Sequence, residues 1–104
     1  MDVTNLLTSR REALGKLCAR YGVTRLEAFG SALREDFRPG ESDLDLLVEF
    51  GPMPPYARVD AYFSLRDELR ALLGQEIDLV MAGAVKNRYL ARNIERTKKL
   101  LYAA

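Results

Sequence analysis

The chain has 104 residues, 48% of them hydrophobic and 30% charged, which are the proportions of one soluble globular domain. A formal net charge of +1 argues against a general nucleic-acid-coating protein, and the sequence has neither a secretory signal pattern nor an apolar stretch of about 18 residues that could span a membrane. With one cysteine and no histidine, any metal site must use carboxylates, whose oxygen atoms favour magnesium or manganese. Because the sequence shows neither a signal pattern nor a membrane-spanning stretch, we expect a cytoplasmic protein.

The first predicted elements are a helix, a strand and a turn. Residues 2–20 carry apolar side chains at helical spacing, and Cys18 lies on this apolar stripe, where packing is its expected role. A short apolar run over residues 26–29 predicts a strand that turns at Gly30 and Ser31 into a helix N-terminus. Such a turn favours a bound anion, although a Gly-Ser pair alone is usually a simple turn and helix cap.

The most informative segment is the strand predicted over residues 43–50. Apolar residues alternate there with Asp43, Asp45 and other residues of a second face, which is the period of a strand. Residues two apart project from the same face with Cα atoms about 6.6 Å apart, so the two aspartates point toward one locus. Two carboxylates about 4 Å apart repel by about 4 kcal/mol near a protein surface, which favours a bound divalent cation. Ordinary solvent-facing aspartates are the alternative explanation.

A second strand of the same kind is predicted further along the chain. After a proline-rich turn, a mostly buried helix is expected over about residues 59–73, followed by a strand over residues 76–81. Asp78 lies on the polar face of this strand. If it lies beside the strand of residues 43–50, the Asp78 carboxylate completes a triad able to hold two magnesium ions about 3.5–4 Å apart.

The end of the chain is basic. A helix is expected from about residue 85 to residue 96, while residues 98–102 fit either its continuation or a final short strand. The clustered cations make a candidate docking surface for an acidic partner, although a solvated helix face explains them equally well. These cations are Lys86, Arg88, Arg92, Arg96, Lys98 and Lys99.

Two motifs in combination resemble the signature of the DNA polymerase β-like nucleotidyltransferase superfamily, in particular its minimal nucleotidyltransferase (MNT) branch. They are Gly30-Ser31-Ala32-Leu33-Arg34 and Ser42-Asp43-Leu44-Asp45-Leu46-Leu47-Val48. The resemblance spans nearly the whole chain and implies a single minimal nucleotidyltransferase domain over residues 1–104. It implies an α/β (α+β) fold of the polymerase β-like type, with a small mixed sheet of three to four strands and helices packed on one face.

The resemblance also implies a role for each carboxylate. By position, Asp43 and Asp45 are magnesium ligands, and Asp78 is the third carboxylate of the metal site, which helps to activate the acceptor hydroxyl. All three would be catalytic. Two magnesium ions are expected, with manganese as the alternative metal.

Phosphate binding is implied for the first motif. Gly30 and Ser31 would bind the triphosphate of ATP, and the Arg34 guanidinium could neutralise phosphate charge. A solvated loop arginine is the alternative for Arg34. The sequence departs from the branch at Leu33 and Glu35, where alanine and glycine are common, and this affects the path of the phosphate loop but not the metal ligands.

The implied activity is transfer of a nucleoside monophosphate, AMP from ATP in the first instance, to a protein hydroxyl. In toxin-paired members of the branch, the acceptor is a tyrosine of a HEPN-domain ribonuclease toxin, so the chain is expected to act as an antitoxin. The alternative is a non-catalytic antitoxin that neutralises its partner by covering it. Direct nucleic-acid binding is not expected, because a basic face interleaved with aromatic residues is missing. The sequence leaves open whether the chain forms homo-oligomers.

Overall fold

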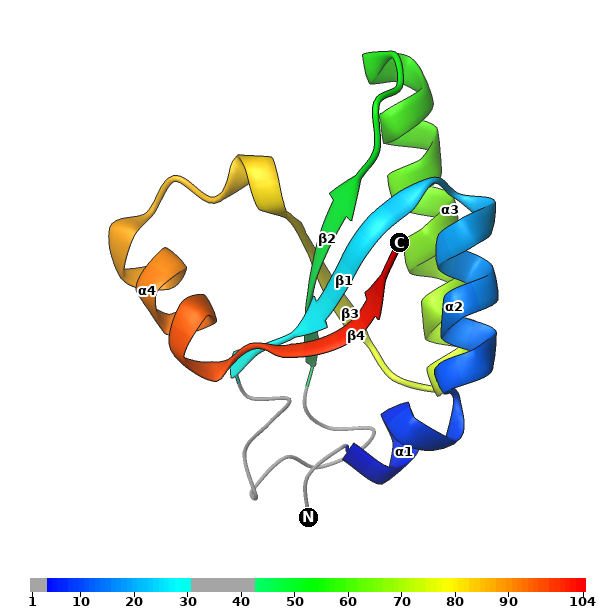
Figure 1. Cartoon of the computed structure of the whole chain (residues 1–104), viewed down its shortest axis with the longest axis horizontal. Helices are drawn as coiled ribbons and strands as arrows, with labels where there is room; N and C mark the ends of the chain where they lie inside the picture. Colours follow the sequence, from blue (N-terminus) through cyan, green and yellow to red (C-terminus); the bar gives the residue numbers. More distant parts are fainter. Residues whose placement is uncertain (1–3, 31–42) are drawn as a thin grey trace.

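The computed structural model describes residues 4–30 and 43–104, which form an α/β fold around one mixed sheet (Figure 1). The sheet has four strands in the order β3-β2-β1-β4, so the predicted fold class is confirmed. Strand β1 is antiparallel to both of its neighbours, whereas β2 and β3 are parallel. In chain order the elements are α1 (Thr4–Ser9), α2 (Arg11–Arg20), β1 (Val23–Ala28), β2 (Leu44–Phe50), α3 (Pro55–Leu73), β3 (Ile77–Met81), the short 3-10 helix η2 (Ala82–Ala84), α4 (Arg88–Thr97) and β4 (Lys99–Ala103).

The hydrophobic core lies between the sheet and helices α2 and α3, which cover one face (Figure 1). The alternation of β2 is realised as predicted, because Leu44, Leu46 and Val48 are completely buried while the residues between them are not. Helix α3 contributes Leu65 and Leu69, one turn apart and both completely buried. Among the described residues, no helix is both long and apolar enough to cross a membrane.

The predicted first helix, residues 2–20, is wrong as a single element, because the chain bends at Arg10 between α1 and α2. The Ser9 hydroxyl donates a hydrogen bond to the carbonyl of Leu6 (2.9 Å), and the Arg10 N–H is shared between the carbonyls of Leu6 and Leu7. Such local bonds tighten a helix end. The bend lets Leu7 and Leu14 both reach the core, where they are 3% and 1% exposed.

The end of the chain is a strand, which decides between the two alternatives for residues 98–102. Strand β4 pairs with the free edge of β1, and its Leu101 and Tyr102 pack against the core. Helix α4 begins at Arg88, because the Asn87 side chain accepts hydrogen bonds from the N–H groups of Tyr89 (2.8 Å) and Leu90 (3.1 Å).

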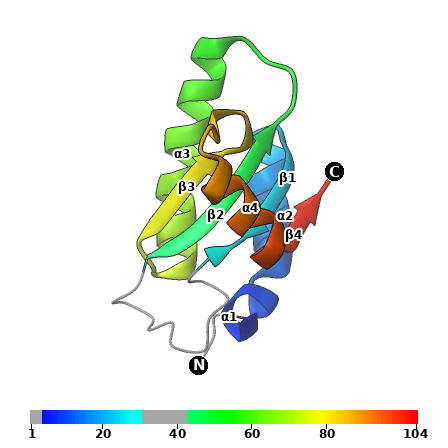
Figure 2. The same ribbon diagram turned by 90° about the vertical axis from the view of Figure 1, so that its left-hand side faces the viewer.

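Helix α4 lies over the opposite face of the sheet from α2 and α3 (Figure 2). The prediction of helices packed on one face therefore holds for α2 and α3 but not for α4. The reason is that the second face of the sheet is only partly polar. Leu47 of β2 lies on this face, and it lines a small cavity together with Ile94 of α4, which is 3% exposed. The sheet thus has the core on one face and α4 on the face that carries Asp45 and Asp78.

Candidate active site

Strands β2 and β3 bring two of the predicted aspartates together. In the parallel β2–β3 pair, Asp45 lies directly opposite Asp78. Neighbouring strands are about 4.8 Å apart, and both residues alternate with buried aliphatic residues, so their side chains leave the same face of the sheet. The strand adjacency on which the role of Asp78 depended is therefore present. Parallel pairing follows from the connection through α3, which returns the chain to the same end of the sheet.

Gly30 packs directly against one of these carboxylates. Its backbone has a φ of +63°, and a Cβ atom at this position would lie 2.9 Å from Oδ2 of Asp45. The preceding residue is also tied to this strand, because the Phe29 N–H donates to the Asp45 carbonyl (3.1 Å). Glycine is therefore strongly favoured at position 30, since a side chain would need a strained left-handed backbone and would displace the Asp45 carboxylate.

A cavity of about 520 Å³ opens beside these residues, which is within the range of small-molecule sites. Its wall has two parts, one from the sheet side with both carboxylates and one from α4. The α4 residues were not predicted as site residues; the sequence signal that could have pointed to this helix is that the resemblance to the MNT branch spans nearly the whole chain. The lining residues are Phe29, Gly30, Asp45, Asp78, Val80, Leu90, Asn93, Arg96 and Thr97.

The remaining predicted site residues are placed differently. Asp43 is exposed just before β2 and is not among the residues that line this cavity. Ser31 and Arg34 lie outside the described residues. Within residues 4–30 and 43–104, no group of three acidic, cysteine or histidine side chains has the arrangement of a metal site. Asp45 and Asp78 nevertheless supply carboxylate oxygens at one wall, the donors that suit a hard divalent cation, and the third ligand stays a prediction.

The end of α4 is joined to the Gly30 turn by a hydrogen-bonded threonine. The Thr97 hydroxyl accepts from the Gly30 N–H (3.1 Å) and donates to the carbonyl of Asn93 (2.8 Å). Because the Gly30 N–H is already used in this way, the structural contribution of Gly30 is its missing side chain rather than a donor.

A buried ion pair also holds the chain just after α4. Glu27 of β1 is 4% exposed and lies 3.2 Å from Nε of Arg25 and 3.7 Å from Nζ of Lys98. The Lys98 ammonium is shared with Glu95 at 3.2 Å. Removing one partner of a buried charge leaves the other uncompensated, so this cluster stabilises the junction between α4 and β4 next to the cavity.

Another cavity, of about 460 Å³, lies at the end of α3 and is also lined by acidic residues. There the Arg70 guanidinium is 2.8 Å from a carboxylate oxygen of Glu76. A protein cation already neutralises that carboxylate, so this cavity is a poorer candidate for a metal-dependent site.

Comparisons with known proteins show the family of the chain. The nucleotidyltransferase domain family matches residues 10–101 of the chain. The chain is 36% identical over 94 residues to a candidate protein adenylyltransferase of Methanocaldococcus jannaschii. The aligned region covers 90% of this chain and 89% of that protein. It is 33% identical over 86 residues to the protein adenylyltransferase MntA of Thermococcus cleftensis, with 83% and 80% covered.

Solved structures show the same fold. One, described as a candidate minimal nucleotidyltransferase, is 35% identical with a TM-score of 0.75 and 95% of each chain covered. A chain of a toxin-antitoxin structure with AMP-PNP has a TM-score of 0.68 at 20% identity, covering 90% of this chain and 73% of that chain. A chain of the complex between the tri-AMPylated HEPN toxin of Shewanella oneidensis and its MNT antitoxin has a TM-score of 0.64 at 19% identity, with 94% and 73% covered. The likeness to these last two is one of fold.

Proposed function

The chain belongs to the nucleotidyltransferase domain family, and we propose that this nucleotidyltransferase moves AMP from ATP to a hydroxyl of a partner protein. The observation that supports this most directly is the cavity in which Gly30, Asp45 and Asp78 meet. The two adenylyltransferase relatives, which align with most of the chain, support AMP as the transferred group.

In this proposal the acceptor oxygen forms a bond to the α-phosphorus of ATP, and the bond from that phosphorus to the bridging oxygen breaks. Pyrophosphate leaves with the bonding electrons. Asp78, exposed at the cavity wall, helps to remove the proton of the acceptor hydroxyl. Asp43, Asp45 and Asp78 would hold magnesium, as two ions or with manganese in their place, and such a metal would supply positive charge beside the phosphate oxygens.

The triphosphate is expected along the first motif. Gly30 leaves space beside the Asp45 carboxylate, which a side chain would occupy. As the motif implies, Ser31 would contribute its hydroxyl and its backbone N–H, and Arg34 its guanidinium. Asp45 therefore borders both the space proposed for the triphosphate and the position proposed for the metal.

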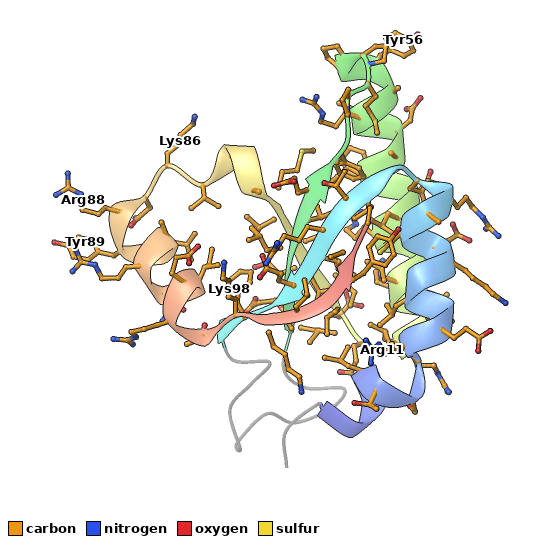
Figure 3. The ribbon with its side chains drawn as sticks, viewed as in Figure 1. Arg11, Tyr56, Lys86, Arg88, Tyr89 and Lys98 are labelled. Atoms are coloured by element: carbon orange, nitrogen blue, oxygen red, sulfur yellow. The ribbon has the colours of Figure 1, made fainter. Side chains whose placement is uncertain are left out.

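We further propose a HEPN-domain toxin as the partner, with one of its tyrosines as the acceptor, so that this chain is a cytoplasmic antitoxin formed by a single domain, residues 1–104. The complex of a HEPN toxin with an MNT antitoxin of the same fold supports this choice. The outer side of α4 offers a docking surface for an acidic partner. Lys86, Arg88 and Tyr89 project there away from the sheet, and Tyr89 is 80% exposed (Figure 3).

The test is co-expression of the chain with a HEPN-domain partner, followed by mass spectrometry of that partner. The unaltered chain is expected to add one or more AMP groups, and the double variant Asp43→Asn plus Asp45→Asn is expected to add none. Glu49→Gln is the matched control, because Glu49 is an exposed acid on β2 that does not line the cavity. Equal labelling with the double variant would remove both aspartates from the mechanism. Neutralisation of the partner without any mass gain would instead favour the non-catalytic alternative.

A further inference from the structure

We propose that Arg96 of α4 is a nucleotide-binding residue that contacts the β- and γ-phosphates of the bound triphosphate. This inference rests on the proposed function and adds a residue from an element that the carboxylate motifs do not include. Arg96 belongs to the last turn of α4 and lines the 520 Å³ cavity together with Asp45 and Asp78.

Charge is unevenly distributed around the cavity. The sheet contributes carboxylates and α4 contributes a guanidinium, so the wall is acidic on one side and basic on the other. A metal-bound nucleoside triphosphate has the matching arrangement of charge. The carboxylates would bind its cation, while its outer phosphates remain anionic and suit the guanidinium. Arginine suits such phosphates, since its planar guanidinium can donate two parallel hydrogen bonds to one phosphate.

Among the described residues, the Arg96 guanidinium has no acidic partner. In the described part of the chain, Arg96 takes part in no ion pair, whereas Lys98, two residues later, is shared between Glu27 and Glu95. The two cations at the end of α4 thus have different roles. Lys98 binds the helix end to the sheet, and Arg96 remains available to a ligand.

The attachment of the last turn of α4 to Gly30 indicates which part of the nucleotide would lie near Arg96. The neighbouring residue, Thr97, accepts the hydrogen bond from the Gly30 N–H, so the last turn of α4 is attached to the turn where the triphosphate is proposed to lie. The hydrogen bond of Gly30 and the ion pair of Lys98 limit movement of this turn. Arg96 is therefore positioned for the triphosphate, and the β- and γ-phosphates carry most of the negative charge that is left after metal binding.

The experiment compares the unaltered protein with Arg96→Gln and Arg96→Lys in isothermal titration with a non-hydrolysable ATP analogue and with AMP, both in the presence of Mg²⁺. Arg96→Gln is expected to weaken binding of the ATP analogue by about 10- to 100-fold, the range for hydrogen bonds to charged groups, and to change AMP binding by less than about twofold. Arg96→Lys should lie between, because it keeps the charge without the bidentate geometry. Arg92→Gln is the matched control, since Arg92 is one turn earlier on α4, exposed and not in the cavity wall. It should bind the analogue as the unaltered protein does.

The outcomes separate this inference from the proposed function. Equal affinity of Arg96→Gln and the unaltered protein for the ATP analogue overturns the role of Arg96 and leaves the proposed function intact. An equal loss of AMP and analogue affinity overturns the assignment to the β- and γ-phosphates, and circular dichroism of each variant shows whether a folding defect accounts for it. Failure of the unaltered protein to bind the analogue overturns both proposals.

Discussion

Replacing Gly30 by alanine tests whether the contact between the Gly30 turn and Asp45 matters for the reaction. The new Cβ would lie 2.9 Å from Oδ2 of Asp45, while ordinary contacts begin at about 3.5 Å, so the carboxylate must withdraw by about 0.6 Å or more. Misplacing a reacting group by about 1 Å can cost about 100-fold in rate. We therefore expect Gly30→Ala to lose about 10- to 100-fold of the AMP-transfer activity.

The backbone contributes a separate cost in stability. A residue with a side chain at φ +63° costs about 1–2 kcal/mol, and the collision adds about 1 kcal/mol or more. For a domain of this size, 1 kcal/mol lowers the melting temperature by about 4–8 °C. Gly74→Ala is the matched control, because Gly74 has nearly the same φ of +64° but nothing within 4 Å of its Cβ position.

The assay pairs thermal unfolding with AMP transfer to a co-expressed partner. Gly74→Ala should lose stability through its backbone alone and keep its activity, whereas Gly30→Ala should lose more stability and most of its activity. If both variants lose the same stability and both retain activity, the contact between Gly30 and Asp45 has no part in placing the carboxylate, and the reasoning fails.

Three further predictions concern the core and its helices. Burial raises the pKa of the Cys18 thiol to about 12, so a thiol reagent at pH 8 should label the folded chain far more slowly than the chain in urea; rapid labelling of the folded chain would contradict this. The pKa of Tyr21 is raised above its usual value of 10, mainly because its hydroxyl donates a hydrogen bond to Glu68 and secondly because of burial. The protonated hydroxyl therefore stabilises the folded chain fully below pH 10, and this stabilisation declines as the pH rises through the folded-state pKa. Unfolding in urea as a function of pH should show this decline in the unaltered protein and a weaker one in Tyr21→Phe. Leu65→Ala should cost about 2–5 kcal/mol in the same assay, because Leu65 is completely buried, while Val59→Ala, at a half-exposed position of the same helix, should cost far less.

The sequence predicted the part of the site that depends on local periodicity. Alternation along a strand is a property of consecutive residues, so the second face of β2 with Asp45 and the polar face of Asp78 were readable without a structure, whereas Asp43 lies just before β2 and its shared face with Asp45 stays a prediction. The pairing of Asp45 with Asp78 could only be stated as a condition, because strand order depends on contacts between distant segments. The structure meets that condition through the parallel β2–β3 pair.

The break at Arg10 shows why helical spacing alone does not define a helix. Apolar residues on both sides of Arg10 follow one period, and only packing against a shared core requires the chain to bend there. The final strand is a similar case, since residues 99–103 become a strand because β1 has an edge with unpaired hydrogen-bonding groups.

By itself, the sequence determined the faces of the strands, the candidate carboxylates and the family resemblance. Each of these depends on short motifs of residues that are close together in the sequence. Only the tertiary structure decided that α4 crosses the face that carries the carboxylates and that Arg96 joins the cavity wall. The physical reason is the distance along the chain. Gly30 and Thr97 are 67 residues apart, and the hydrogen bond between them exists only after the sheet has brought β1 beside β4.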